Sequence, residues 1–169
     1  MSAIIALVFP LTLIAAAVSD FKRLEIPNGL SVVLLMGFLV YSFASGIGLD
    51  RIGANLALGL AVLLVGAVLF RFGLLGGGDI KLLAAAAPWV GWSELPSFLL
   101  WVALWGGVLA AAILIVRRLK GGRAVSGPQW WQRLCSSDYG VPYGVSICAG
   151  GLTVWIDVLN PVGVGYSFP

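Results

Sequence analysis

The sequence predicts an all-α, polytopic integral membrane protein with six transmembrane helices and with both termini outside. Three observations support this fold class: an apolar composition, long apolar stretches, and basic residues gathered on one side. Of the 169 residues, 60% are hydrophobic and 10% are charged, and the mean hydropathy is +1.05. Soluble domains carry about 25% charged residues. Charges this sparse cannot cover a water-facing surface, so residues 1–169 are expected to form one helical membrane domain.

The spans follow from the lengths of the apolar stretches, because a spanning helix needs about 20 residues. Five stretches meet or nearly meet this length, and the fourth of the six is shorter: 1–18, 29–48, 52–70, 80–92, 95–116 and 141–159. The first is expected to be retained rather than cleaved, since no basic residue precedes Lys22. The short stretch contains Pro88. Irregular glycine backbone before it is expected to add depth, which is tolerated beside protein or a water-filled cavity.

Basic residues set the topology. With the N-terminus outside, six spans place nine of the ten basic residues inside: Lys22, Arg23, Arg71, Lys81, Arg117, Arg118, Lys120, Arg123 and Arg133. Arg51 alone falls outside. Asp20 and Asp79 then reach the same, cytoplasmic, face from different loops. The basic segment 117–140 is expected to be a cytoplasmic loop, either a connector lying on the membrane surface or a contact for substrate.

The residue inventory excludes several kinds of site. The chain has no histidine, which removes histidine triads, histidine bases and histidine metal ligands. Its two cysteines, Cys135 and Cys148, form no C-x-x-C pair, so a zinc site is not expected and both thiols should be free. Nothing resembles a nucleic-acid-binding stripe. We therefore expect no metal, no cofactor and no nucleic-acid partner.

A carboxylate follows three glycines in the segment GGGDIK, residues 76–81. An ionisable side chain near hydrocarbon is costly and indicates a functional site. Asp79 could instead serve as a helix N-cap before residues 80–83. A cap, however, does not require three glycines, whereas close approach of the backbone to a ligand or another segment does.

Asp20 is the second acid of interest, at the end of the first apolar stretch. A carboxylate at a helix C-terminus is disfavoured by the helix dipole, so a purely structural role explains it poorly. Pro27 and Asn28 follow closely and suit the turn into the next helix. This geometry would hold Asp20 in place.

Two carboxylates that share one water make a hydrolytic site. Like charges a few ångströms apart do not both ionise easily, so one stays protonated while the other acts as a base. The base activates water for attack on a peptide carbonyl, and the protonated partner assists the leaving amine. This chemistry needs neither a metal nor a histidine.

Three segments resemble the type IV prepilin peptidases, which are GxGD membrane aspartyl proteases. Residues 19–28 (SDFKRLEIPN) are similar to the first aspartate motif of the family, residues 76–82 (GGGDIKL) to the GxGD motif, and residues 141–144 (VPYG) to the PYG segment of the last span. The resemblance implies that Asp20 and Asp79 are the catalytic pair. It assigns supporting positions to Gly76, Gly77, Gly78, Lys81, Ile26, Pro27, Asn28, Pro142, Tyr143 and Gly144. For Lys81 a plain lysine reaching to the membrane interface is the alternative.

The resemblance also implies a substrate, a location and a subtype. The substrate would be a prepilin or pseudopilin, cut after a glycine that ends a short basic leader, at the cytoplasmic face of the inner membrane. Partners would be the bilayer and pilus or secretion assembly machinery. The chain lacks the cysteine-paired extension of the large bifunctional members, so it resembles the small Flp/Tad-type enzymes and N-methylation is not expected. Archaeal preflagellin peptidases are the nearest alternative. A non-catalytic assembly subunit and a small transporter are the alternatives of a different class.

Overall fold

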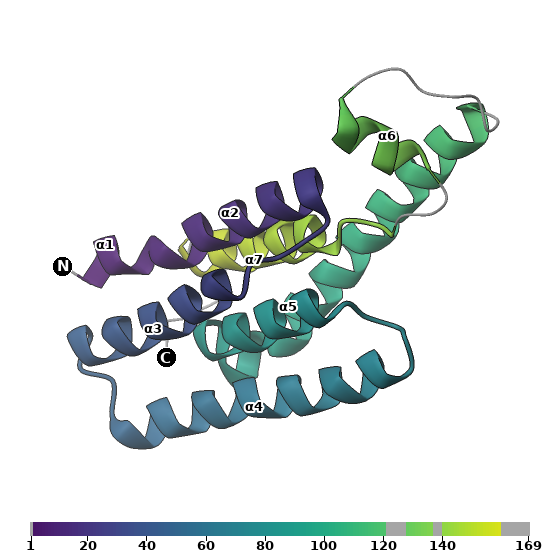
Figure 1. The fold of residues 1–169 in the computed structure, drawn as a ribbon. Coiled ribbons are helices and arrows are strands. Elements are labelled where there is room, and N and C mark those ends of the chain that lie inside the picture. The colour runs from purple at the N-terminus through teal and green to yellow at the C-terminus, as the bar shows by residue number, and fades with distance from the viewer. Residues whose placement is uncertain (1, 121–127, 137–139, 160–169) are drawn as a thin grey trace.

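The computed structural model describes residues 2–120, 128–136 and 140–159, and every regular element in these ranges is a helix (Figure 1). The helices are α1 (Ser2–Ala6), α2 (Val8–Arg23), α3 (Asn28–Ala44), α4 (Leu49–Arg71), α5 (Gly77–Lys120), α6 (Gln129–Cys135) and α7 (Tyr143–Leu159). Leu7 keeps right-handed helical angles between α1 and α2. The two therefore continue as one apolar helix, and the all-α prediction is confirmed.

Within the described ranges, three helical segments are long and apolar enough to cross a membrane: Ile4–Arg23, Leu49–Arg71 and Gly77–Leu119. Two shorter apolar helices, Asn28–Ala44 and Tyr143–Ile156, accompany them. The protein is thus an all-α membrane protein. The count of six spans and the external termini stay predictions.

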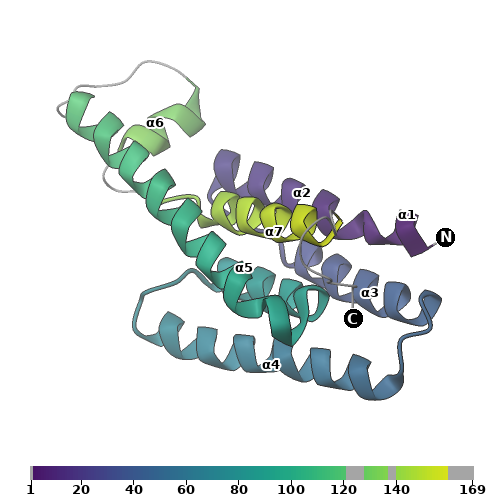
Figure 2. The ribbon, with the colours of Figure 1, turned by 180° about the vertical axis from the view of Figure 1, so that it is seen from behind.

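Helix α5 is two helices joined at Gly91, which has φ 77° and ψ 175°. This backbone region is essentially restricted to glycine. The first arm, 77–90, lies between α3 and α4, and the second arm, 92–120, turns back toward α6 (Figures 1 and 2). The break falls close to the boundary predicted between the short fourth stretch and the fifth.

The glycine run was expected to be irregular backbone, and this is wrong beyond Gly76. The first arm begins at Gly77, so Gly77 and Gly78 belong to its first turn. Asp79 therefore lies inside the helix and is not its N-cap. The helix therefore begins three residues before the short stretch 80–92.

Close helix contacts depend on glycine, as expected for packing in lipid. A methyl group on Gly59 of α4 would lie 2.8 Å from the Ala84 carbonyl oxygen of α5, and one on Gly151 of α7 would lie 2.5 Å from Leu13 of α2. Gly66 of α4 similarly faces Ile80. Helix α7 packs against both α2 and α5, while α4 packs against α5. These contacts bring the ends of α2 and α4 and the starts of α5 and α7 into one bundle.

An aromatic cluster fixes the bundle at the end of α2 that lies away from Asp20. Trp89 of α5 contacts the rings of Phe9, Phe38 and Tyr41, and its indole N–H donates a 2.8 Å hydrogen bond to the Leu34 carbonyl oxygen. Buried aromatic pairs of this kind stabilise a core beyond their area. The segment 24–27 and the start of α5 lie at the opposite end, where the polar residues gather.

The predicted loop 117–140 is partly helical. Helix α5 continues through Lys120, and α6 occupies Gln129–Cys135. Residues 121–127 and 137–139, which include Arg123, lie outside the described residues. Cys135 and Cys148 are both free, as predicted.

Candidate active site

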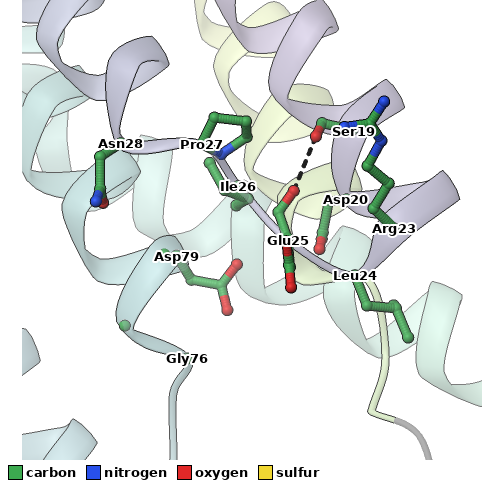
Figure 3. Close-up of a pocket in the computed structure, with 12 residues that line it drawn as sticks. Ser19, Asp20, Arg23, Leu24, Glu25, Ile26, Pro27, Asn28, Gly76 and Asp79 are labelled. Atoms are coloured by element: carbon green, nitrogen blue, oxygen red, sulfur yellow. Dashed lines mark hydrogen bonds between the residues drawn. The ribbon is translucent and has the colours of Figure 1, made fainter.

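A cavity of about 510 Å³ lies between the end of α2, the segment 24–27 and the start of α5 (Figure 3). Two of the sequence motifs line it. The lining residues are Ser19, Asp20, Arg23, Leu24, Glu25, Ile26, Pro27, Asn28, Gly76, Gly77, Gly78 and Asp79. The two acids singled out from the sequence therefore share one cavity, although 58 residues separate them along the chain.

Asp20 is buried, with 6% of its surface exposed. The backbone N–H of Gly144 donates a 2.6 Å hydrogen bond to its Oδ2. Gly144 is the second residue of α7, where backbone N–H groups have no partner within the helix. The positive end of that helix dipole favours a carboxylate. The dipole of α2 thus disfavours the Asp20 carboxylate, and the hydrogen bond and dipole at the start of α7 compensate for this.

The chain leaves α2 by a sharp turn at Leu24. This residue has φ 55°, the left-handed conformation, and its N–H donates to the Asp20 carbonyl oxygen. The Ser19 hydroxyl then donates a 2.9 Å hydrogen bond to the carbonyl oxygen of Glu25 (Figure 3). The segment 24–27 is therefore held against α2 on both sides of Asp20.

Asp79 lies in the first turn of α5 and is half-buried. Its carboxylate accepts a hydrogen bond from the backbone N–H of Gly76, the residue before the helix. This is the reciprocal bond of a capping box. A methyl group on Gly76 would lie 2.6 Å from Asp79 Oδ2, so the carboxylate covers the glycine directly. Asp79 therefore caps the start of α5 from the third helical position, and not as the N-cap residue that the sequence offered as an alternative.

The two carboxylates interact electrostatically. Figure 3 shows the Asp79 side chain pointing across the cavity toward Asp20. Each carboxylate is held by one backbone N–H, that of Gly144 or of Gly76. Their remaining oxygens are left for a water molecule or a substrate group between them.

Ile26 ties the two aspartate motifs to the third motif. A methyl group on Gly78 would lie 3.2 Å from the Ile26 Cβ, and one on Gly144 would lie 3.1 Å from its Cδ1. Ile26 therefore packs closely between α5 and α7, and a side chain at either glycine would require it to shift. Pro27 follows in extended conformation and directly precedes α3.

Lys81 and Asn28 form a second tie. The Lys81 ammonium donates a 2.9 Å hydrogen bond to Asn28 Oδ1, so the start of α5 is linked to the start of α3. The alternative, a lysine that only reaches to the membrane interface, does not account for this hydrogen bond. The sequence did not predict that these two residues would pair, since they are 53 positions apart.

Pro142 and Tyr143 support the site from α7. Pro142 is fully buried. The Tyr143 ring lies on Gly106 of α5, where a methyl group would come within 2.9 Å of its hydroxyl oxygen. This contact fixes where α7 begins and hence where the Gly144 N–H points.

Helix α6 packs on the last turn of α2. The rings of Trp130 and Phe21 are 5.3 Å apart, and Arg133 donates a 3.4 Å hydrogen bond to the Arg23 carbonyl oxygen. The paired tryptophans were the only sequence signal for this arrangement. The contact between Trp130 and Phe21 places α6 beside the last turn of α2, which lines the cavity.

No group of three or more His, Cys, Asp or Glu side chains within the described residues could hold a metal ion. The cavity offers two acids, several backbone groups, and a polar rim that includes Arg23 and Glu25. Such a site can exchange protons with a bound water and a substrate.

Comparison with known proteins identifies a family. The model of the type IV leader peptidase family matches residues 7–111 of this chain, more than half of it. The match includes both acids and ends before α6. No solved structure matches the chain significantly.

Three curated relatives carry the name prepilin leader peptidase/N-methyltransferase. The protein of Aeromonas salmonicida (strain A449) is 31% identical over 121 residues, which are 66% of this chain and 40% of that protein. The protein of Pectobacterium carotovorum subsp. carotovorum is 37% identical over 62% of this chain and 39% of its own length. The protein of Legionella pneumophila is 28% identical over 91% of this chain and 50% of its own. The chain thus spans half or less of these relatives.

Proposed function

The chain belongs to the type IV leader peptidase family, and from this premise we propose that it is an aspartic endopeptidase that removes the leader from prepilins or pseudopilins. The observation that carries the proposal is the meeting of Asp20 and Asp79 in one cavity, with interacting carboxylates. The named relatives are prepilin leader peptidases, which supports the substrate class.

The reaction we propose uses the pair as a unit. Two neighbouring carboxylates share a proton, so one acts as base while the other acts as acid. The base takes a proton from a water molecule, and the resulting hydroxide attacks the carbonyl carbon of the scissile peptide bond. The acid polarises that carbonyl and then protonates the leaving amine as the bond breaks. The two roles belong to the coupled pair rather than to one residue.

The surrounding backbone favours this chemistry by fixing both acids. Asp20 is anchored to α7 through Gly144, and Asp79 is anchored to the start of its own helix through Gly76. Preorganised groups need no rearrangement at the moment of reaction. The two anchors come from different helices, so the bundle itself sets the spacing of the pair.

The location of the cavity supports cleavage at the membrane surface. Asp20 lies in the last turn of α2, next to Lys22 and Arg23, and Asp79 lies in the first turn of α5, next to Lys81. Basic residues near the ends of spans favour the cytoplasmic side. We propose that the cavity opens to the cytoplasm at the inner membrane, as in a small Flp/Tad-type enzyme.

The test is co-expression with candidate prepilins in a host that lacks its own prepilin peptidases. Leader loss is read by the mass of the pilin, beside the variants Asp20→Ala and Asp79→Ala. We expect cleavage by the parent and by neither variant, and the product mass also shows whether the new N-terminus is methylated. Cleavage by all three proteins would show that the reaction does not depend on this pair.

A further inference from the structure

A second cavity of about 480 Å³ opens beside the first, as a groove between α3, α4 and the first arm of α5. Its lining residues are Asn28, Ser31, Val32, Leu35, Leu56, Gly59, Leu60, Leu63, Lys81, Ala84, Ala85 and Pro88. Asn28 lines both cavities. The groove therefore begins where the candidate active site ends, and we call it the apolar groove.

The polarity of the groove changes along its length. Its three polar residues, Asn28, Ser31 and Lys81, belong to the first turns of α3 and α5, which adjoin the active site. The rest of the lining is aliphatic. On α3 the lining runs from Asn28 to Leu35, which is about 10 Å at the helical rise of 1.5 Å per residue.

The floor of the groove is fixed by close helix packing. Gly59 of α4 lies against the Ala84 carbonyl oxygen and the Pro88 ring of α5, closer than any side chain would allow. Leu60 and Val32 flank the floor and are each 56% exposed. Small residues below and exposed aliphatic residues at the sides leave a channel that an apolar chain can fill.

We propose that the apolar groove binds the segment of the substrate that follows the scissile bond, and that this segment is therefore apolar. This inference rests on the proposed function. A short basic leader is too polar for an aliphatic groove, so of the two sides of the cut the segment after it is the one that fits the groove. The two cavities adjoin at Asn28, and one chain passes from the acids over this residue into the groove.

The polar end of the groove favours a peptide over a lipid chain. A peptide leaving the active site still carries backbone N–H and C=O groups that need partners. Lys81 and Asn28 stand at this point, and the Ser31 hydroxyl is buried without a hydrogen-bond partner among the described residues. A lipid acyl chain would use none of these groups.

The test compares two substrates in liposomes. One is a prepilin with its apolar segment, and the other is a soluble peptide with the same cleavage site and serines in place of the apolar residues. Leu60→Trp and Val32→Trp fill the groove. Leu64→Trp and Val33→Trp are matched controls, since Leu64 is 61% and Val33 50% exposed and neither lines the groove.

We expect Leu60→Trp and Val32→Trp to lower the ratio of kcat/KM for the prepilin over that for the peptide at least tenfold. The controls should keep the parent's ratio. An unchanged ratio in both groove variants, or an equal fall in the controls, overturns the proposal. If the parent cleaves neither substrate, the proposed function itself fails, and this is seen before any variant is compared.

A second measurement tests the proposal without the tryptophan variants, in case one of them fails to fold. A photo-crosslinking amino acid is placed at position 60 or at position 64 of the Asp79→Asn protein, in liposomes with the prepilin. We expect a crosslink to the apolar segment of the prepilin from position 60 and a much weaker one from position 64. A crosslink from position 60 to lipid alone would make an acyl chain the occupant and overturn the proposal.

Discussion

The Gly144 backbone N–H donates to Asp20 Oδ2 at 2.6 Å, so the carboxylate that ends α2 occupies the start of α7. The two residues are 124 positions apart. Burial of a carboxylate is costly unless it is hydrogen-bonded, and a helix N-terminus supplies both donors and a favourable dipole. This contact explains how a chain so apolar keeps a buried acid at the end of its first long helix.

Gly144→Ala is expected to lower peptidase activity by about 100-fold, because a misplacement of about 1 Å near the chemistry costs that much. The added methyl group would lie 2.9 Å from Asp20 Oδ2 and 3.0 Å from its Cβ, so the carboxylate must move. Cleavage of a prepilin in detergent or liposomes checks this. Gly107→Ala is the matched control, since a methyl group there meets nothing within 4 Å. Equal rates in the two variants would show that Asp20 is not held by this contact.

Asp20→Asn and Asp79→Asn are expected to lower kcat by at least about 100-fold each, the scale of general acid–base catalysis. Both changes keep the shape of the side chain and remove its ability to exchange the proton. Because the acids act as a unit, the double variant should be no slower than the slower single variant. Asp50→Asn is the control, an exposed acid in the first turn of α4. A single variant that retains parental turnover would falsify the proposed pair.

The helices and the shared face of the acids could be predicted because they depend on local features. Apolar stretches predict the helices, and the basic residues predict one shared face for Asp20 and Asp79, in agreement with the cavity that both acids line. The side of the membrane stays a prediction. The helical start at Gly77 could not be predicted, since three glycines disfavour a helix. A local bond and a tertiary contact override this preference, because Asp79 caps Gly76 and Gly78 lies against Ile26 of the segment 24–27.

Contacts between residues far apart in the chain could likewise not be predicted from the sequence. Nothing in the spacing of Lys81 and Asn28 marks them as partners, and the donor for Asp20 is a backbone group that any residue carries. Helix α6 is only seven residues long, too short for a periodic pattern to appear. These features follow from how α2, α5 and α7 pack.

The hydrogen bond from Lys81 to Asn28 predicts coupled effects on stability. Lys81→Met and Asn28→Ala should each lower the free energy of unfolding by less than about 1 kcal/mol, because both side chains are exposed and such bonds contribute modestly. The double variant should lose little more than either single variant, since the same bond is lost in each. Thermal unfolding in detergent of the four proteins measures this cycle. Strictly additive losses would mean that the two side chains stabilise the protein separately.

The contact between Trp130 and Phe21 predicts that α6 restrains the end of α2. Their rings are 5.3 Å apart, and aromatic pairs contribute about 0.5–1.5 kcal/mol beyond area burial. Trp130→Ala should therefore speed hydrogen exchange of the Leu24 amide, whose N–H donates to the Asp20 carbonyl oxygen at 2.7 Å. It should also lower peptidase activity severalfold, because Asp20 then loses part of its support. Trp130→Phe keeps a ring against Phe21 and should restore most of both properties. If exchange at Leu24 is the same in the parent and in Trp130→Ala, then α6 rests on α2 without restraining it, and the position of Asp20 depends on Gly144 alone.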